Sequence, residues 1–257
     1  MSSTRVCAFC DQPSPLTREH IWPRCVIERT PSYNARYLGK TEKFFEGELT
    51  VRDVCAACNN GVLSSLDDYI CNLYDTQFSR VAARRQPRTV LFDYGLLLRW
   101  LLKASYNSAR ANQSDIAVLK RYASYILAGT PDPDGLQVRL ELIAPSKNPR
   151  HVPGSTGMQE IPPYSVRCCR IEIPHNPVPG TTVRLVAVNS FYFWLVFWSS
   201  GTDASSLLQF LPGKPLAPNM DRVTLTPKRG TLEVLADWVL NPNANRSMKS
   251  FGARNRG

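Results

Sequence analysis

Two closely spaced pairs of cysteines are the clearest chemical signature of this chain. Each pair has two residues between its members, and the four residues are Cys7, Cys10, Cys55 and Cys58. Thiolates in two such pairs can surround one zinc ion tetrahedrally. Random placement of the eight cysteines would give only about 0.25 pairs at this spacing. The pattern therefore predicts a structural zinc site, and the alternative is four unrelated thiols.

Three polar residues lie beside these cysteines in the sequence. Glu19 and His20 fall between the two pairs, and Asn59 directly follows the second pair. Closing the zinc site would bring the three together. Carboxylate and amide oxygens are ligands for a hard divalent ion, and an imidazole can take a proton from water near neutral pH. The set predicts metal-assisted hydrolysis. The alternatives are an exposed Glu–His ion pair and an Asn59 that only caps a helix.

The order of these motifs resembles the HNH endonuclease family. The matching runs are Cys-x-x-Cys, then Glu-His-Ile-x-Pro from Glu19 to Pro23, then Val-Cys-x-x-Cys-Asn-Asn-Gly from Val54 to Gly61. The resemblance covers residues 7–70, a little over a quarter of the chain, and is closest to the variant with zinc knuckles. It implies a metal-dependent endonuclease that cleaves phosphodiester bonds of nucleic acid.

The resemblance also implies a role for individual residues. His20 would be the general base, and Glu19 and Asn59 would hold a catalytic Mg or Mn ion. The middle motif of the family is usually an Asn that orients the histidine, but this chain has Thr50 at that offset. The Thr50 hydroxyl is a partial substitute for that asparagine. The departure favours, as the alternative function, a non-catalytic zinc-stabilised nucleic-acid-binding protein on the same scaffold.

The hydrophobic pattern predicts the elements that position these residues. Leu16–Ile21 and Val51–Val54 are typical of short strands, and from Cys55 the apolar residues recur on one helical face. Asp67 lies on that helix, where a solvated acid is expected. Further helices are predicted over 96–111 and 114–128, and further strands over 136–144, 164–173, 182–188 and 191–199.

The predicted fold class is α+β, with a small zinc-stapled ββα-metal (HNH-like) module followed by a larger helix-plus-antiparallel-sheet domain. The predicted units are the HNH-like module at 1–75, a basic connector at 76–92, an α+β domain of unknown role at 93–241, and a disordered basic tail at 242–257. The apolar run Phe191–Trp198 favours a central strand covered on both faces.

The net charge of +10 is unevenly distributed. Residues 1–70 hold 8 Lys or Arg and 9 Asp or Glu, and residues 71–257 hold 23 and 12. A polyanion would therefore be attracted mainly by the larger part of the chain, and nucleic acid is the expected partner, with DNA favoured over RNA. The candidate contacts are Arg80, Arg84, Arg85 and Arg88, and the alternative is a solvated basic connector.

The sequence also predicts the compartment of the protein. No apolar leader precedes Cys7, so no secretory signal is expected. The longest apolar run, Phe191–Trp198, is far shorter than the ~20 residues of a membrane span. A cytoplasmic protein without a membrane partner is therefore expected. In that setting disulfides are rare, so the remaining cysteines, Cys25, Cys71, Cys168 and Cys169, are predicted to be buried free thiols.

Overall fold

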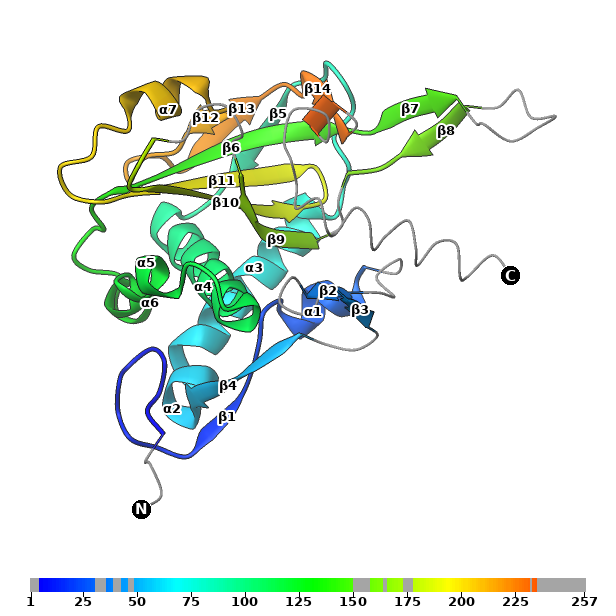
Figure 1. Ribbon diagram of the computed structural model, residues 1–257. Helices are drawn as coiled ribbons and strands as arrows, with labels where there is room; N and C mark the ends of the chain where they lie inside the picture. Colours follow the sequence, from blue (N-terminus) through cyan, green and yellow to red (C-terminus); the bar gives the residue numbers. More distant parts are fainter. Residues whose placement is uncertain are drawn as a thin grey trace.

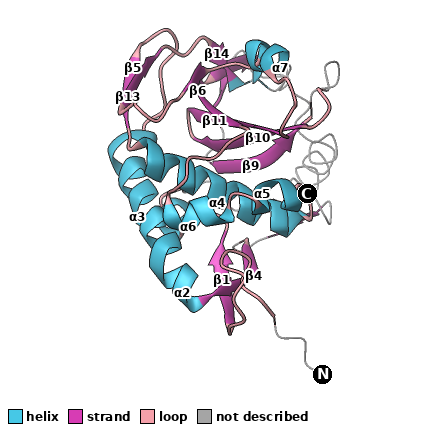
Figure 2. Ribbon diagram, turned by 90° about the vertical axis from the view of Figure 1, so that its left-hand side faces the viewer, coloured by secondary structure: helices cyan, strands magenta, loops and turns pink. Residues whose placement is uncertain are grey.

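A long helix, α4 (Tyr94–Asn112), lies between a large sheet and a small two-stranded sheet (Figures 1 and 2). The computed structural model describes residues 5–30, 36–38, 43–45, 49–149, 158–163, 166–172, 178–231 and 233–234. Its mixture of helices and antiparallel sheets confirms the predicted α+β class. The predicted tail at 242–257 lies outside the described residues.

The small sheet, which we call the hairpin, consists of the two strands predicted around the candidate site, although residues 21–49 separate them in the chain. Strand β1 (Leu16–His20) pairs antiparallel with β4 (Thr50–Cys55), and a register irregularity falls between Thr17 and Glu19. The chain then continues through α2 (Ala56–Cys58), the π-helical turn η1 (Asn59–Leu63) and α3 (Ser64–Leu73). The short helix α1 (Arg24–Glu28) follows β1, and β2 (Arg36–Leu38) pairs with β3 (Lys43–Phe45).

The large sheet has the strand order β12–β6–β11–β10–β9, and β14 also pairs with β6. Its long strands are β6 (Leu136–Ala144), β9 (Val166–Ile171), β10 (Thr181–Val188) and β11 (Phe191–Trp198), and the short ones are β12 (Lys214–Pro215) and β14 (Arg229–Gly230). The four long strands pair antiparallel. The predicted central position of the run 191–198 is confirmed.

Both faces of β11 are buried, because side chains alternate across a strand. Phe191, Phe193, Leu195 and Phe197 belong to the hydrophobic cluster that includes α4. Tyr192, Trp194 and Val196 belong to a second cluster with α7 (Ser205–Phe210) on the opposite face. Helix α4 therefore covers one face of the sheet.

The predicted single helix over 114–128 is wrong. The structure has two short helices there, α5 (Ile116–Lys120) and α6 (Ala123–Ala128). The side chains between them make tertiary contacts instead: Arg121 Nη2 donates to the carbonyl of Trp198, and the Tyr122 hydroxyl donates to the carbonyl of Gly135. Anchoring to the sheet thus overrides helix propensity at the join.

The prediction that Cys25 and Cys71 are free thiols is also wrong. A disulfide joins them, with their Cα atoms 6.1 Å apart, and so links α1 to α3. Their separation of 46 residues gives no signal in the sequence, because only the packing of the two helices brings the thiols within bonding reach. Cys168 and Cys169 are free.

The predicted connector contains regular structure. It begins in η2 (Tyr74–Phe78) and ends in β5 (Arg88–Leu91), which pairs with β13 (Arg222–Leu225). The remaining pair is β7 (Ser146–Pro149) with β8 (Met158–Ile161). Among the described residues, no helix combines the length and the apolar character needed to cross a membrane.

Candidate functional site

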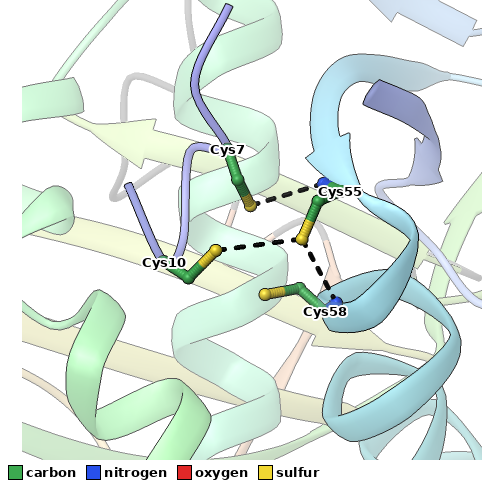
Figure 3. A group of neighbouring side chains, drawn as sticks. All are labelled: Cys7, Cys10, Cys55 and Cys58. Atoms are coloured by element: carbon green, nitrogen blue, oxygen red, sulfur yellow. Dashed lines mark hydrogen bonds between the residues drawn. The ribbon is translucent and has the colours of Figure 1, made fainter. Parts of the chain in front are cut away.

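The four predicted zinc ligands form one cluster, the cysteine cluster of Cys7, Cys10, Cys55 and Cys58 (Figure 3). Their sulfurs all lie within 4.8 Å of one another, and the Cys10 and Cys55 sulfurs are 3.8 Å apart. Zinc–sulfur bonds of about 2.3 Å place the sulfurs of a tetrahedral site about 3.8 Å apart. The cluster can therefore hold a metal ion such as zinc.

Local backbone hydrogen bonds shape this cluster. The first pair lies in a tight turn, in which Cys7 N donates to Gln12 O and Asp11 N donates to Cys7 O, each at 3.0 Å. Cys55 ends β4 and caps α2, because its sulfur accepts from Cys58 N at 3.4 Å. Cys55 N also donates to the Cys7 sulfur at 3.4 Å, which joins the two pairs.

The electrostatic surroundings differ between the thiols. Burial raises the pKa of Cys7, but N–H groups of Cys10, Cys55 and Phe9 outweigh it and bring that pKa down to about 7. Burial, followed by the neighbouring thiols of Cys55 and Cys10, raises the pKa of Cys58 well above its usual range. Because metal ligation requires thiolates, Cys7 is better prepared for it than Cys58.

Asn59 connects the helical segment to β1. Its amide nitrogen donates to the carbonyl of Arg18 at 2.7 Å and to the hydroxyl of Thr17 at 2.8 Å. A carbonyl only accepts, so the amide nitrogen must face the strand, and Oδ1 is turned away from it. Asn59 does not cap the start of the helix, because the Cys55 sulfur does. The sequence places these residues far apart, and the fold brings them into direct contact.

His20 is the last residue of β1 and is half-buried. It lies opposite Thr50 in the register of the hairpin. The carbonyl of His20 accepts a hydrogen bond from Asn107 Nδ2 at 2.9 Å. The predicted middle-motif residue, Thr50, is therefore a strand neighbour of the predicted base.

Glu19 is buried, with 3% exposure, so the alternative of an exposed Glu–His ion pair is wrong. Its Oε1 accepts from Lys103 Nζ at 2.7 Å and from Asn107 Nδ2 at 3.1 Å. Among the described residues, no hydrogen bond reaches Oε2. One carboxylate oxygen is thus held by α4, and the other is left as an acceptor.

Asp67 shares the same lysine and is not the solvated acid that the pattern predicts. Its Oδ1 lies 2.6 Å from Lys103 Nζ and accepts from Trp100 Nε1 at 3.2 Å. Burial lowers the pKa of Lys103, but Asp67 and then Glu19 outweigh it, so that pKa is raised. Burial raises the pKa of Asp67 even though Lys103 opposes the shift. We call Glu19, Lys103 and Asp67 the buried ion triad.

Sequence reasoning missed Lys103 and Asn107, which lie on one face of α4. Both are fully buried, and both contact Glu19. Arg110, one turn further on, donates to Asn107 Oδ1 at 2.8 Å and pairs with Asp53 of β4 at 3.0 Å. The available signal was a lysine and an asparagine inside a mostly apolar helical run.

The four arginines proposed as nucleic-acid contacts have different surroundings. Arg84 pairs with Glu233 at 2.6 Å. Arg88 turns inward and donates to the carbonyls of Gln77 and Arg80. Arg80, Arg84 and Arg85 are exposed. Two of the four guanidinium groups therefore bind acceptors within the protein.

An open cavity of about 610 Å³ lies between the turn of the first cysteine pair, β4 and the end of α4. Its lining includes Thr50, Asp53, Arg110 and Lys120, but not Glu19, His20 or Asn59. The cavity is therefore adjacent to the hairpin without containing the candidate catalytic set.

Comparisons with protein-family models, curated proteins and solved structures return no match. The geometry of the hairpin and its motifs is therefore the basis for assigning a function.

Proposed function

We propose that this chain is a metal-dependent endonuclease that cleaves phosphodiester bonds of nucleic acid, DNA rather than RNA, on a zinc-stapled, HNH-like module. One observation carries the proposal: Asn59, the third motif, donates to the backbone of Arg18 at 2.7 Å. This contact joins the third motif to the strand that ends in Glu19 and His20. The motif order that resembles HNH endonucleases is thus matched by proximity between the first and third motifs.

In this proposal His20 is the general base. It takes a proton from the water that attacks phosphorus, a role suited to an imidazole near neutral pH. The hydrogen bond from Asn107 to its carbonyl fixes the backbone of the residue. Thr50 lies opposite it in the hairpin and is the available substitute for the missing asparagine.

Two side-chain oxygens of the candidate site are of the chemical type that binds a Mg or Mn ion. Glu19 offers Oε2, because Lys103 and Asn107 bind Oε1, and Asn59 offers Oδ1. A carboxylate and an amide oxygen suit such hard ions, which keep several waters. When bound, the ion would supply charge stabilisation to the phosphate and its leaving oxygen. The protein residues hold these two oxygens in place.

The test is a plasmid-nicking assay with the zinc-loaded full chain, with Mg²⁺, with Mn²⁺ and with a chelator. His20→Ala should reduce cleavage by about 10²- to 10⁴-fold, the usual contribution of a positioned base. Glu19→Gln and Asn59→Ala should weaken the response to the divalent ion. His175→Ala, which changes a histidine outside residues 1–75, is the matched control. Cleavage by His20→Ala at the wild-type rate would rule out this mechanism.

Non-catalytic nucleic-acid binding on the same scaffold is the second candidate. The observation that favours it is the enclosure of Glu19, which is 3% exposed and paired with Lys103, whereas His20 is half-buried. Salt-sensitive binding of DNA without cleavage under any metal would support this second function. Absence of both binding and cleavage at low salt would exclude both candidates.

A further inference from the structure

Asn107 occupies an unusual position for an amide side chain. It is fully buried in the middle of α4, and all three of its side-chain hydrogen bonds are to charged or backbone groups. Nδ2 donates to Glu19 Oε1 at 3.1 Å and to His20 O at 2.9 Å, and Oδ1 accepts from Arg110 at 2.8 Å. One amide thus contacts both residues of the Glu-His motif.

The orientation of this amide is fixed from its far side. Arg110 can only donate, so it requires Oδ1 and leaves Nδ2 facing β1. Arg110 is itself held by Asp53 of β4 at 3.0 Å, and its guanidinium carbon lies 4.1 Å from the Tyr106 ring centroid. An ion pair between Asp53 and Arg110, followed by the hydrogen bonds of Asn107, therefore links β4 through α4 to β1. Rotation of Asn107 would break contacts on both sides.

Lys103 acts on the same oxygen of Glu19. Its ammonium lies 2.7 Å from Oε1, so that oxygen receives both donors. Ligating carboxylates in metal sites are commonly hydrogen-bonded on the oxygen that does not bind the ion, and such partners affect both affinity and activity. The arrangement leaves Oε2 as the acceptor with a fixed direction.

We propose that Asn107 is a positioning residue of the nuclease site: helix α4, from outside the cysteine-rich module, fixes the carboxylate of Glu19 and the backbone of His20 at once. This inference rests on the proposed function. Asn107 touches neither water nor phosphate in the reaction and acts only through Glu19 and His20. In the HNH family an asparagine of the middle motif orients the histidine. The hairpin has only Thr50 at that place, and Asn107 takes over the orienting role from α4.

The test uses two near-isosteric variants and a control on the same helix. Asn107→Leu removes both amide groups. Asn107→Asp keeps the acceptor for Arg110 but replaces the donor by an acceptor beside Glu19. Ser105→Ala is the control, because the Ser105 hydroxyl is buried without a hydrogen-bond partner among the described residues. Its removal should leave the site unchanged.

Two readouts separate positioning from a packing role. The kcat and KM of plasmid nicking are measured well below each variant's melting temperature. Mn²⁺ affinity is measured on zinc-loaded protein by the electron paramagnetic resonance signal of free Mn²⁺. Both Asn107 variants should lower kcat and weaken Mn²⁺ binding by about 10- to 100-fold, with KM within about threefold of wild type. A merely structural role would lower the melting temperature and leave the kcat and Mn²⁺ affinity of the folded protein unchanged.

The outcomes separate the two proposals. If wild type nicks DNA and the Asn107 variants match Ser105→Ala in kcat and Mn²⁺ affinity, the inference about Asn107 is overturned and the nuclease proposal stands. If wild type neither nicks DNA nor binds Mn²⁺ in a way that Glu19→Gln abolishes, the proposed function fails, and the role of Asn107 fails with it.

Discussion

At the scale of single residues, the buried ion triad is an arrangement with a high desolvation cost. Lys103 is fully buried between Glu19 and Asp67, at 2.7 and 2.6 Å. Burying charges carries a large desolvation penalty, which is offset only when the partners are close and well hydrogen-bonded. Removing the lysine would leave the buried carboxylate of Glu19 and the partly buried carboxylate of Asp67 without a counter-ion.

We predict that Lys103→Met lowers the free energy of unfolding by about 3–5 kcal/mol at pH 7, the usual effect of breaking a buried pair. Urea denaturation followed by circular dichroism measures this change. Lys120→Met is the matched control. Lys120 is half-buried and pairs at 2.6 Å with the exposed Asp11, and pairs near the surface contribute at most about 1 kcal/mol.

The defect of Lys103→Met should depend on pH. Burial already raises the pKa of Asp67 in the wild type, and losing the lysine removes the effect that opposes this shift. A carboxyl whose pKa is raised by folding stabilises the folded state below its unfolded pKa, and that contribution is lost as pH rises through the folded pKa. The variant should therefore approach wild-type stability toward pH 4. An equal deficit at pH 4 and pH 7 would contradict this account of the triad.

Sequence reasoning predicted only part of the site at this scale. The cysteine cluster could be predicted, because ligand spacing is local and each pair is read from four consecutive residues. Lys103 and Asn107 could not, because their partners Glu19 and His20 lie more than 80 positions away. The Cys25–Cys71 disulfide was missed for the same reason: no local pattern encodes a contact between two helices.

At the scale of elements, the cysteine cluster fastens three separate pieces: the turn at 7–12, the end of β4 and the helix α2. The hairpin between them is short and pairs over few residues. Structural zinc contributes on the order of 10 kcal/mol in small modules. Here the hairpin also packs against α4, so the metal is one of two anchors.

We predict that the purified chain holds about one zinc ion, as measured by elemental mass spectrometry, and that Cys55→Ser with Cys58→Ser abolishes binding. In this double variant, amide hydrogen exchange should become faster in β1, β4 and α2 than in the same elements of the wild type, with a smaller change in β10 and β11. Zinc affinity should fall as pH falls, because ligation releases thiol protons. Cys169→Ser, outside the cluster, is the control and should retain zinc. Wild-type zinc content in the double variant would show that other residues hold the ion.

The elements themselves were predicted unevenly. Strand 191–198 could be predicted from its unbroken apolar run, and strand 136–144 from apolar residues that alternate with polar ones over most of its length. The helix over 114–128 was misread because its sequence is helical throughout, yet Asp115 adopts a left-handed conformation and accepts ion pairs from Arg170 and Arg184. These partners come from β9 and β10 and fix where α5 begins, whereas the break between α5 and α6 falls at Arg121 and Tyr122, which bond to the carbonyls of Trp198 and Gly135.

At the scale of the whole molecule, α4 joins the hairpin to the sheet. Leu66 and Ile70 of α3 share one hydrophobic cluster with Leu97 and Leu101 of α4 and with Phe193 of β11. The predicted boundary at residue 75 lies within this continuous core. A fragment that ends there would expose apolar side chains and the carboxylate of Glu19.

We predict that residues 1–75 alone, supplied with zinc, lack a cooperative thermal transition and bind a hydrophobic dye. Differential scanning calorimetry and dye fluorescence measure the two properties. A fragment extended to residue 112 restores Lys103 and Asn107 and should recover part of the cooperativity, and the full chain is the reference. Unfolding of the 1–75 fragment at the temperature of the full chain would show that the module is independent of α4.

Because α4 packs against both the hairpin and the large sheet, it also limits how this sequence can be inherited. A recombination event that transferred only the cysteine-rich segment would deliver a carboxylate without its counter-ion and a histidine without its backbone anchor. Exchange that preserved the site would have to carry residues 94–112 along, although nothing in that stretch resembles a nuclease motif. The segment that must be inherited as one piece therefore extends to residue 112, well past Gly61, where the last of the quoted motifs ends.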